Sequence, residues 1–520
     1  MLRHFVRESF FGHCYELVTG KCLFANSAPH LKWDDDSIET LEAKDVSKEV
    51  YTVGWDGPDD IENPYNWPLA AKLFISVELS LLQLSVYMCA AIYTPGIHQL
   101  MEDFDIGYTM AMLPLSLYVI GYGMGTMIFS PFSENPLMGR NSMYIITTFM
   151  YAVFQIPIAL SKNIASLTVL RFLAGFFGST PLANVGASFA DFVKVPYLPV
   201  GLGVWGVVSL SGPALGPFFG SLIVNARDWR WTFWFTLILS GSTLAIVIFF
   251  LPETHADTLH YRKYRRIVRQ TGKTDIYCEA KEKINQDVMA SLKEMLWRPL
   301  VISIVEPVVL LINVYICLVY SVVYLWFEAF PIVYSEVYHF GTVQTGTCYL
   351  SLIVGVILGT IPFLIYLYYK FTKVLLRGDT VYPEVFIPLA IVGNQLMTAG
   401  LFIFGWTASA QLHWFPPMIG AALCGASMLI NFQSFLNYLG MSFPRFMASV
   451  FASNNLVRSV VAGVFPLFGR SVYLNLSTSK FPVAWGASVL GFLSLAMGAI
   501  PVLFYLNGPK LRARSNYAGN

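Results

Sequence analysis

Long apolar stretches recur along the chain and are separated by short polar segments. Each stretch runs for about 18 to 25 residues almost without charge, which is the length that a helix needs to cross the hydrocarbon core of a bilayer. A large soluble core would instead show shorter apolar runs with polar interruptions. The pattern predicts about twelve transmembrane helices, at 71–93, 110–129, 142–160, 166–190, 199–223, 231–251, 303–329, 346–369, 386–406, 415–439, 447–472 and 483–506.

One long polar stretch, rich in lysine and arginine, interrupts this series between the sixth and the seventh predicted helix. We therefore expect an all-α membrane protein with two six-helix bundles that repeat one architecture. The predicted divisions are an N-terminal segment at 1–69, a first bundle at 70–251, a central loop at 252–299, a second bundle at 300–506 and a tail at 507–520.

Composition and charge support this interpretation and orient the chain. Hydrophobic residues make up 55% of the 520 residues and charged residues only 12%, about half the charged share of an ordinary soluble domain. Lysine and arginine gather in the central loop, in the 370–385 connection and in the tail, and they are absent from 94–109 and 407–414. Because positive charge in short loops marks the cytoplasmic side, we expect a multi-pass protein with both termini in the cytoplasm. We expect the first membrane helix to direct insertion, since no cleaved signal peptide is visible.

Few ionisable side chains lie inside the predicted spans, where each costs on the order of 2.5 to 3.5 kcal/mol to insert. Arg171, in the fourth helix, either extends toward the membrane surface or is a buried guanidinium that changes partners when a nearby carboxylate binds or releases a proton. Arg458, in the eleventh helix, is either a packing anchor or a contact for substrate or coupling. We expect Glu78, Glu306 and Glu328 to lie near the lipid headgroups.

The fifth helix has the clearest backbone pattern, with repeated glycines and prolines within GLGVWGVVSLSGPALGPFFG. Glycines permit close helix contact, and each proline removes a backbone donor, so we expect a tightly packed and bent helix. The residues concerned are Gly206, Gly212, Pro213, Gly216, Pro217 and Gly220. The eleventh helix repeats the theme in GVFPLFG (463–469), which is weak evidence for duplicated halves.

Aromatic and amide side chains fall at helical spacings in the second half. They are candidates to line a roomy, mostly apolar cavity for hydrophobic cargo, and helix packing is the alternative explanation. The candidate substrate residues are Asn313, Tyr320, Tyr324, Phe327, Asn431, Gln433, Asn454 and Arg458.

Several catalytic motifs are absent from the sequence. It contains no GxxxxGK[ST], no HExxH and no CxxC pair, so ATP-driven pumping and metal-dependent hydrolysis lose support. We expect no metal, no cofactor and no nucleic-acid partner. A membrane-embedded enzyme or sensor would need a catalytic constellation or a dedicated soluble domain, and the sequence shows neither.

From about Trp55 onward the chain resembles the major facilitator superfamily, specifically the fungal twelve-helix drug:proton antiporters. It is most similar to the yeast exporters associated with resistance to benomyl, methotrexate and fluconazole. The segments that carry the resemblance are WDGPDDIENPYNWP (55–68), SLYVIGYGMGTMIFSPFSENPLMGRN (116–141), LRFLAGFFGS (170–179), GPALGPFFGS (212–221), WRWTFW (229–234), EPVVLLINVYICLVYSVVYLWFEAFPI (306–332), PVAWGASVLGF (482–492) and GPKLRARS (508–515).

The resemblance implies roles for three sites. The segment from Ser130 to Arg140 looks like the cytoplasmic gating loop, with Glu134 in its acidic position and Gly139 and Arg140 closing it; a carboxylate and an arginine there would clamp the two halves in one conformation. Arg171 matches the arginine implicated in proton coupling, and Asp191 is a second coupling candidate. The glycines and prolines of the fifth helix match the motif that distinguishes antiporters from sugar importers.

The resemblance therefore implies proton-driven export of varied small hydrophobic compounds by alternating access. We expect a monomer in the plasma membrane, surrounded by lipid and driven by the proton gradient alone. An importer or facilitator of a specific solute on the same fold is the alternative, and the antiporter motif argues against it.

Overall fold

The computed structural model describes residues 2–19, 53–271, 277–285, 288–513 and 515, and twelve of its helical segments are long and apolar enough to cross a membrane. Six of them form the first half: α4 (Leu69–Ala91) continuing through α5 (Ile97–Phe104), α6 (Tyr108–Ser133), α7 (Gly139–Ala159), α8 (Ile164–Phe177) with α9 (Thr180–Phe192), α10 (Leu198–Ala226) and α11 (Trp231–Phe250). Six form the second half: α15 (Pro307–Phe330), α16 (Thr342–Cys348) with α17 (Leu350–Leu367) and α18 (Lys373–Leu376), α19 (Ile387–Thr407), α20 (Phe415–Ser442), α21 (Met447–Asn475) and α22 (Ala484–Met497) with α23 (Ala499–Ala513). The predicted all-α architecture with twelve spans is confirmed.

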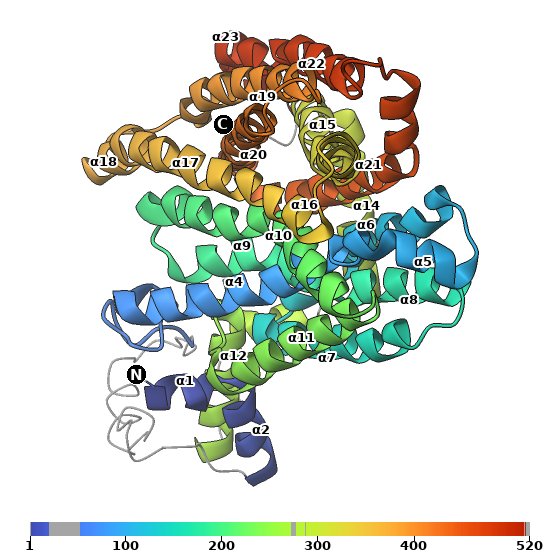
Figure 1. Cartoon of the computed structure of the whole chain (residues 1–520). Helices are drawn as coiled ribbons and strands as arrows, with labels where there is room; N and C mark the ends of the chain where they lie inside the picture. Colours follow the sequence, from blue (N-terminus) through green and yellow to red (C-terminus); the bar gives the residue numbers. More distant parts are fainter. Residues whose placement is uncertain (1, 20–52, 272–276, 286–287, 514, 516–520) are drawn as a thin grey trace.

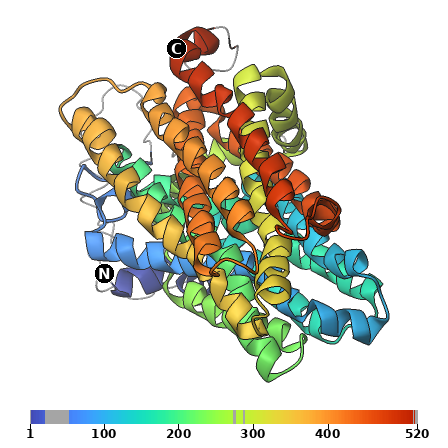
Figure 2. The same ribbon diagram turned by 45° about the horizontal axis from the view of Figure 1, so that its top comes forward.

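The two halves form separate groups of helices. The first half, coloured blue to green, occupies the lower part of Figure 1, and the second half, yellow to red, occupies the upper part. In the turned view the helices of the second half run side by side as a slanted bundle (Figure 2). Helices are stable in the hydrocarbon core of a membrane because they satisfy their own backbone hydrogen bonds where no water is present.

Local sequence explains where several spans begin. Asn163 accepts a hydrogen bond from the Ser166 amide (2.7 Å) and so caps the start of α8. Prolines occupy the first turn of α15 and α20, where a missing amide hydrogen removes no helical hydrogen bond. The short α8–α9 junction after Phe177 divides the fourth span without ending it.

A polar cap lies at one end of the first half. It comprises α1 (Leu2–Glu8), α2 (Phe10–Thr19) and α12 (Ala256–Thr271), and Figure 1 shows α1 and α2 at the lower end of the molecule with α12 beside them. Arg266 on α12 donates to both carboxylate oxygens of Glu8, at 3.0 and 3.2 Å, and Phe5 packs edge-on against Trp67. The predicted central loop therefore contains helices, including α13 (Glu279–Asn285) and α14 (Val288–Val305), which ends just before α15.

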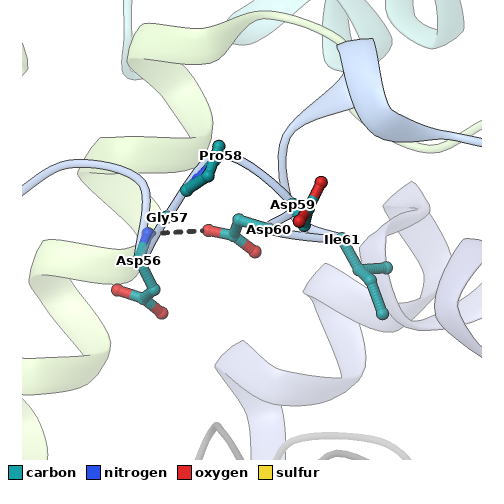
Figure 3. Close-up of a pocket in the computed structure, with 6 residues that line it drawn as sticks. All are labelled: Asp56, Gly57, Pro58, Asp59, Asp60 and Ile61. Carbon is teal, nitrogen blue, oxygen red and sulfur yellow. Dashed lines mark hydrogen bonds between the residues drawn. The ribbon is translucent and has the colours of Figure 1, made fainter.

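The segment that leads into α4 folds into a tight acidic turn beside this cap. The turn Asp56–Ile61 surrounds a small hollow of about 350 Å³ (Figure 3). The Asp60 carboxylate accepts the Asp56 amide at 3.0 Å, and Asp56 pairs with Lys263 on α12. These contacts attach the turn to α12 and account for its acidic residues structurally.

Candidate functional site

Four tyrosines meet at the centre of the molecule, where the two halves contact each other. The Tyr122 hydroxyl on α6 lies 3.0 Å from that of Tyr320 and 2.8 Å from that of Tyr324, both on α15. Tyr87 on α4 packs edge-on against Tyr122, with ring centroids 6.2 Å apart. All four side chains are buried. Hydroxyl groups therefore join the halves across an aromatic interior.

Arg458 brings a positive charge to this tyrosine cluster. Its guanidinium lies over the rings of Tyr320 (4.8 Å) and Phe432 (4.7 Å) and donates to the Asn455 side chain at 2.6 Å. Asn455 in turn donates to the Thr126 hydroxyl on α6 at 2.8 Å. Within the described residues, the guanidinium of Arg458 is satisfied by an amide, a tyrosine hydroxyl at 3.5 Å and aromatic faces, and no carboxylate pairs with it. Such a cation is suited to contact aromatic or electron-rich ligands.

The predicted substrate residues separate into two groups. Phe327 packs against Tyr324 of the tyrosine cluster, and Asn313 of α15 accepts a hydrogen bond at 2.8 Å from Asn454 of α21, the residue before Asn455. Asn431 instead donates to Ser427 within α20 and lies against Gly393 of α19, inside the second half. The remaining candidate, Gln433, lies against Gly206 of the fifth span and has no hydrogen-bond partner for either side-chain polar atom in the described part of the chain.

Arg171 is fully buried among the helices of the first half. Its guanidinium donates to the carbonyls of Cys89 (2.9 Å) and Ala90 (2.7 Å) near the end of α4, and it lies 4.3 Å above the Tyr118 ring. Among the described residues it forms no ion pair, and the structure does not bring it together with Asp191. Arg171 therefore holds α4 against α6 and α8 in this conformation.

The gating loop forms a polar network within the first half. Arg140, at the start of α7, pairs with Asp191 at the end of α9 with an Nε to Oδ2 distance of 2.5 Å. Thr254, beyond α11, donates to the same carboxylate at 3.2 Å. The carboxylate that pairs with Arg140 is thus Asp191 and not Glu134, which is half-buried where α6 ends. In this conformation the pair links three elements of the first half, and a clamp between the halves in another conformation stays a prediction.

Glu253, which was not among the predicted site residues, completes this network. Its carboxylate accepts hydrogen bonds from the backbone amides of Arg140 (3.1 Å) and Asn141 (3.3 Å), which form the first turn of α7. A carboxylate is favoured there because the unpaired amides at a helix N-terminus attract negative charge. Gly139 has a φ of 70°, and a Cβ on it would lie 2.3 Å from Glu253. Glycine is therefore required at this turn by both backbone conformation and space.

The glycines of the fifth span pack α10 directly onto α4. A Cβ on Gly216 would lie 2.6 Å from the Met88 carbonyl, and one on Gly220 would lie 1.9 Å from the Ile92 carbonyl. A Cβ on Gly212 would lie 2.6 Å from the Cβ of Tyr87, whereas Gly206 faces Gln433 of the other half. The helix continues without interruption through Pro213 and Pro217. The expected tight packing is present, chiefly within the first half.

The three glutamates expected near the headgroups are buried inside the protein. Glu328 is fully buried and accepts a hydrogen bond from Tyr108 of the first half at 2.6 Å. Glu78 and Glu306 are each 2% exposed, and neither carboxylate oxygen of Glu78 has a hydrogen-bond partner in the described chain. The described residues contain no group of His, Cys, Asp and Glu that could hold a metal ion.

The sequence comparisons decide the family. A family model described as Major Facilitator Superfamily matches residues 79–466. The chain belongs to this superfamily. The predicted family is thus confirmed, and the protein is a membrane transporter and not an enzyme.

Several fungal relatives are similar to this chain over nearly its whole length. It is 47% identical to the Cycloheximide resistance protein of Candida maltosa, with 99% of each chain covered. It is 40% identical to Fluconazole resistance protein 1 of Saccharomyces cerevisiae, over 93% of this chain and 87% of that protein. The solved structure of the xylose transporter XylE from E. coli covers 84% of this chain and 99% of its own, with a TM-score of 0.55 and 13% identity. That likeness shows the fold alone.

Proposed function

We propose that this protein exports structurally varied small hydrophobic compounds across the plasma membrane in exchange for protons, by alternating access, and so confers multidrug resistance. The observation that carries the proposal is the buried cluster of Tyr87, Tyr122, Tyr320, Tyr324 and Arg458, which combines residues of both halves in the middle of the spans. Aromatic faces offer large apolar contact area, and the few hydroxyl and amide groups orient a ligand without demanding one shape.

The names of the relatives support export over import. Proteins 47% and 40% identical to this chain are named for resistance to cycloheximide and to fluconazole, and removal of a toxic compound from the cell is a direct route to resistance. A solute importer on the same fold is the second candidate. The names of these two relatives do not favour import.

Two charged groups of the first half support coupling to protons, the partly exposed Asp191 and the buried Arg171. Asp191 pairs with Arg140 at the junction of α7, α9 and the segment after α11, so a proton on this carboxylate would remove the charge that holds the junction together. Arg171 holds the end of α4 through two backbone carbonyls. Because these carbonyls lie in the same helix as Tyr87, we propose that Arg171 transmits movement of the first half to the tyrosine cluster.

The test is growth of a yeast host that lacks its own exporters on a panel of unrelated drugs, together with efflux from preloaded cells. We expect resistance to several drug classes and loss of efflux when a protonophore is added. Efflux that persists at the full rate after protonophore treatment would exclude proton coupling, and resistance to no drug would exclude the export proposal.

Arg171→Ala is expected to abolish resistance while the protein still reaches the cell surface, because α4 loses both of its guanidinium contacts. Arg227→Ala is the matched control, since Arg227 is exposed beside the Trp231 ring. Surface protein is measured by labelling intact cells. Wild-type resistance in Arg171→Ala would remove this residue from the coupling role.

A further inference from the structure

A crevice of about 720 Å³ opens between α4 and α10 in the first half, and we call it the α4–α10 crevice. Leu73, Val77 and Leu81 line it from α4, and Val204 and Val208 line it from α10. The end of α9 forms a further wall with Phe189. All of its lining residues belong to the first half or to the segment just before α4, so it is not part of the tyrosine cluster between the halves. Its volume falls within the range of about 300 to 1,000 Å³ typical of small-molecule sites.

Helical geometry places the crevice on the outer, bilayer-facing side of α10. Gly206 faces Gln433 of the second half. At about 100° per residue, Val204 and Val208 lie about 160° around the helix from Gly206, on the opposite face. The side chains of Leu73, Val77 and Val204 are 57%, 56% and 54% exposed. These aliphatic groups are therefore available to the hydrocarbon of the membrane.

Two lysines stand at one end of this apolar wall. Lys72 and Lys194 both line the crevice. Lys72 donates to the Tyr65 carbonyl at 2.9 Å, and within the described residues neither lysine forms an ion pair. From Leu69 to Leu84 the wall is about 22 Å long at 1.5 Å per residue, close to the depth of one bilayer leaflet with its headgroups. The lysines are at the end predicted to face the cytoplasm.

We propose that the α4–α10 crevice binds an anionic phospholipid of the cytoplasmic leaflet. One acyl chain lies along the aliphatic wall, and the lipid phosphate lies between the ammonium groups of Lys72 and Lys194. The charge complementarity decides the occupant. Two cations without carboxylate partners at the headgroup level attract an anion, and the mostly aliphatic wall below them suits an acyl chain. The proposal goes beyond transport and is independent of cargo and coupling ion.

The experiment uses the full chain purified in a mild detergent. Its thermal midpoint is measured with dioctanoylphosphatidylserine and, separately, with dioctanoylphosphatidylcholine, which has the same chains and no net charge. We expect the serine lipid to raise the midpoint more than the choline lipid does. The double variant Lys72→Gln, Lys194→Gln is expected to lose at least half of this difference, and the control Lys370→Gln, exposed on the second half, to keep it.

A second pair of variants tests the apolar wall. Val77→Trp fills the crevice, and Val354→Trp adds the same bulk at a position on α17 that is 51% exposed. Lipid extracted from the purified variants is quantified, and only Val77→Trp is expected to retain less phosphatidylserine. Equal responses to both lipids, or a full serine-lipid response in the double lysine variant, would overturn the proposal. It would also fail if Val77→Trp abolished stabilisation by a neutral azole compound while phosphatidylserine retention stayed unchanged, because the crevice would then hold cargo.

Discussion

The contact between Gly220 and α4 predicts a clear effect of adding one methyl group. A Cβ at this position would lie 1.9 Å from the Ile92 carbonyl oxygen and 2.9 Å from its carbon. Both atoms belong to the backbone, so no side-chain rotation relieves the overlap. Gly220→Ala therefore requires α4 and α10 to move apart. Overpacking of this kind destabilises proteins by about 1 to 3 kcal/mol.

Gly241 on α11 provides the matched control, since a Cβ there would meet no atom within 4 Å. Replacing glycine by alanine inside a helix is worth about 0.5 to 1 kcal/mol in favour of alanine. Both substitutions share this propensity contribution. The difference in stability between Gly220→Ala and Gly241→Ala thus isolates the contact, with an expected size of about 1 to 3 kcal/mol.

The measurement is thermal inactivation of the purified protein, followed as the fraction that remains monodisperse after heating. Unfolding of a protein this large is not two-state, so rates at one temperature are compared. We expect the order Gly241→Ala, wild type, Gly220→Ala from slowest to fastest inactivation. If Gly220→Ala inactivated as slowly as Gly241→Ala, the close approach of the two helices would not exist as described.

Three further substitutions address the tyrosine cluster, the gating network and the polar cap. Tyr122→Phe removes the hydroxyl that contacts Tyr320 and Tyr324. At about 0.6 kcal/mol for an average hydrogen bond within a membrane, we expect a small loss of thermal stability and a changed rate of efflux. Asp191→Asn removes the charge that pairs with Arg140, and we expect efflux to lose its dependence on external pH; an unchanged pH profile would contradict the coupling role. Burial lowers the pKa of His13 from 6.5 to about 4, so the docked cap takes up fewer protons than the undocked one and loses stability as the pH falls from 6.5 toward 4. Limited proteolysis of α2 should therefore accelerate in acid for the wild type and less so for His13→Gln.

The spans could be predicted from sequence because each depends on local composition alone. A run of apolar residues long enough to cross a bilayer has few other stable conformations in a membrane. The candidate positions Tyr320, Tyr324 and Arg458 were also visible, since unusual side chains inside an apolar helix stand out. Tyr87 was not singled out, because its role depends on where α4 meets α6 and α21, which no local pattern specifies.

The gating network also depends on contacts that the sequence alone did not predict. Arg140 was expected to work with a carboxylate, and the family resemblance placed Glu134 in the acidic position of the loop. The pair actually joins Arg140 to Asp191, which is 51 residues away in the chain. Glu253 reaches the first turn of α7 from beyond α11, 113 residues after Arg140. Such partners are fixed by the packing of α7, α9 and α11, so sequence spacing could not identify them.

The contrast between contacts within and between the halves indicates how the molecule would move. Within the first half, α4 and α10 approach at the backbone through Gly216 and Gly220, and parting them would forfeit close packing along several turns. Between the halves, the central contacts are hydroxyl pairs around Tyr122, each worth only a fraction of a kcal/mol to about 1.7 kcal/mol. Two seams are exceptions. Between α6 and α21, a Cβ on Gly123 would lie 2.6 Å from Ser459, and between α10 and α17, a Cβ on Gly203 would lie 2.8 Å from Leu364. A Cβ on Gly346 of α16 would also overlap the Ser221 side chain of α10. A rotation of each half as a unit, with these two seams kept in contact and the tyrosine hydroxyls exchanging partners, is therefore the motion that disrupts the least packing.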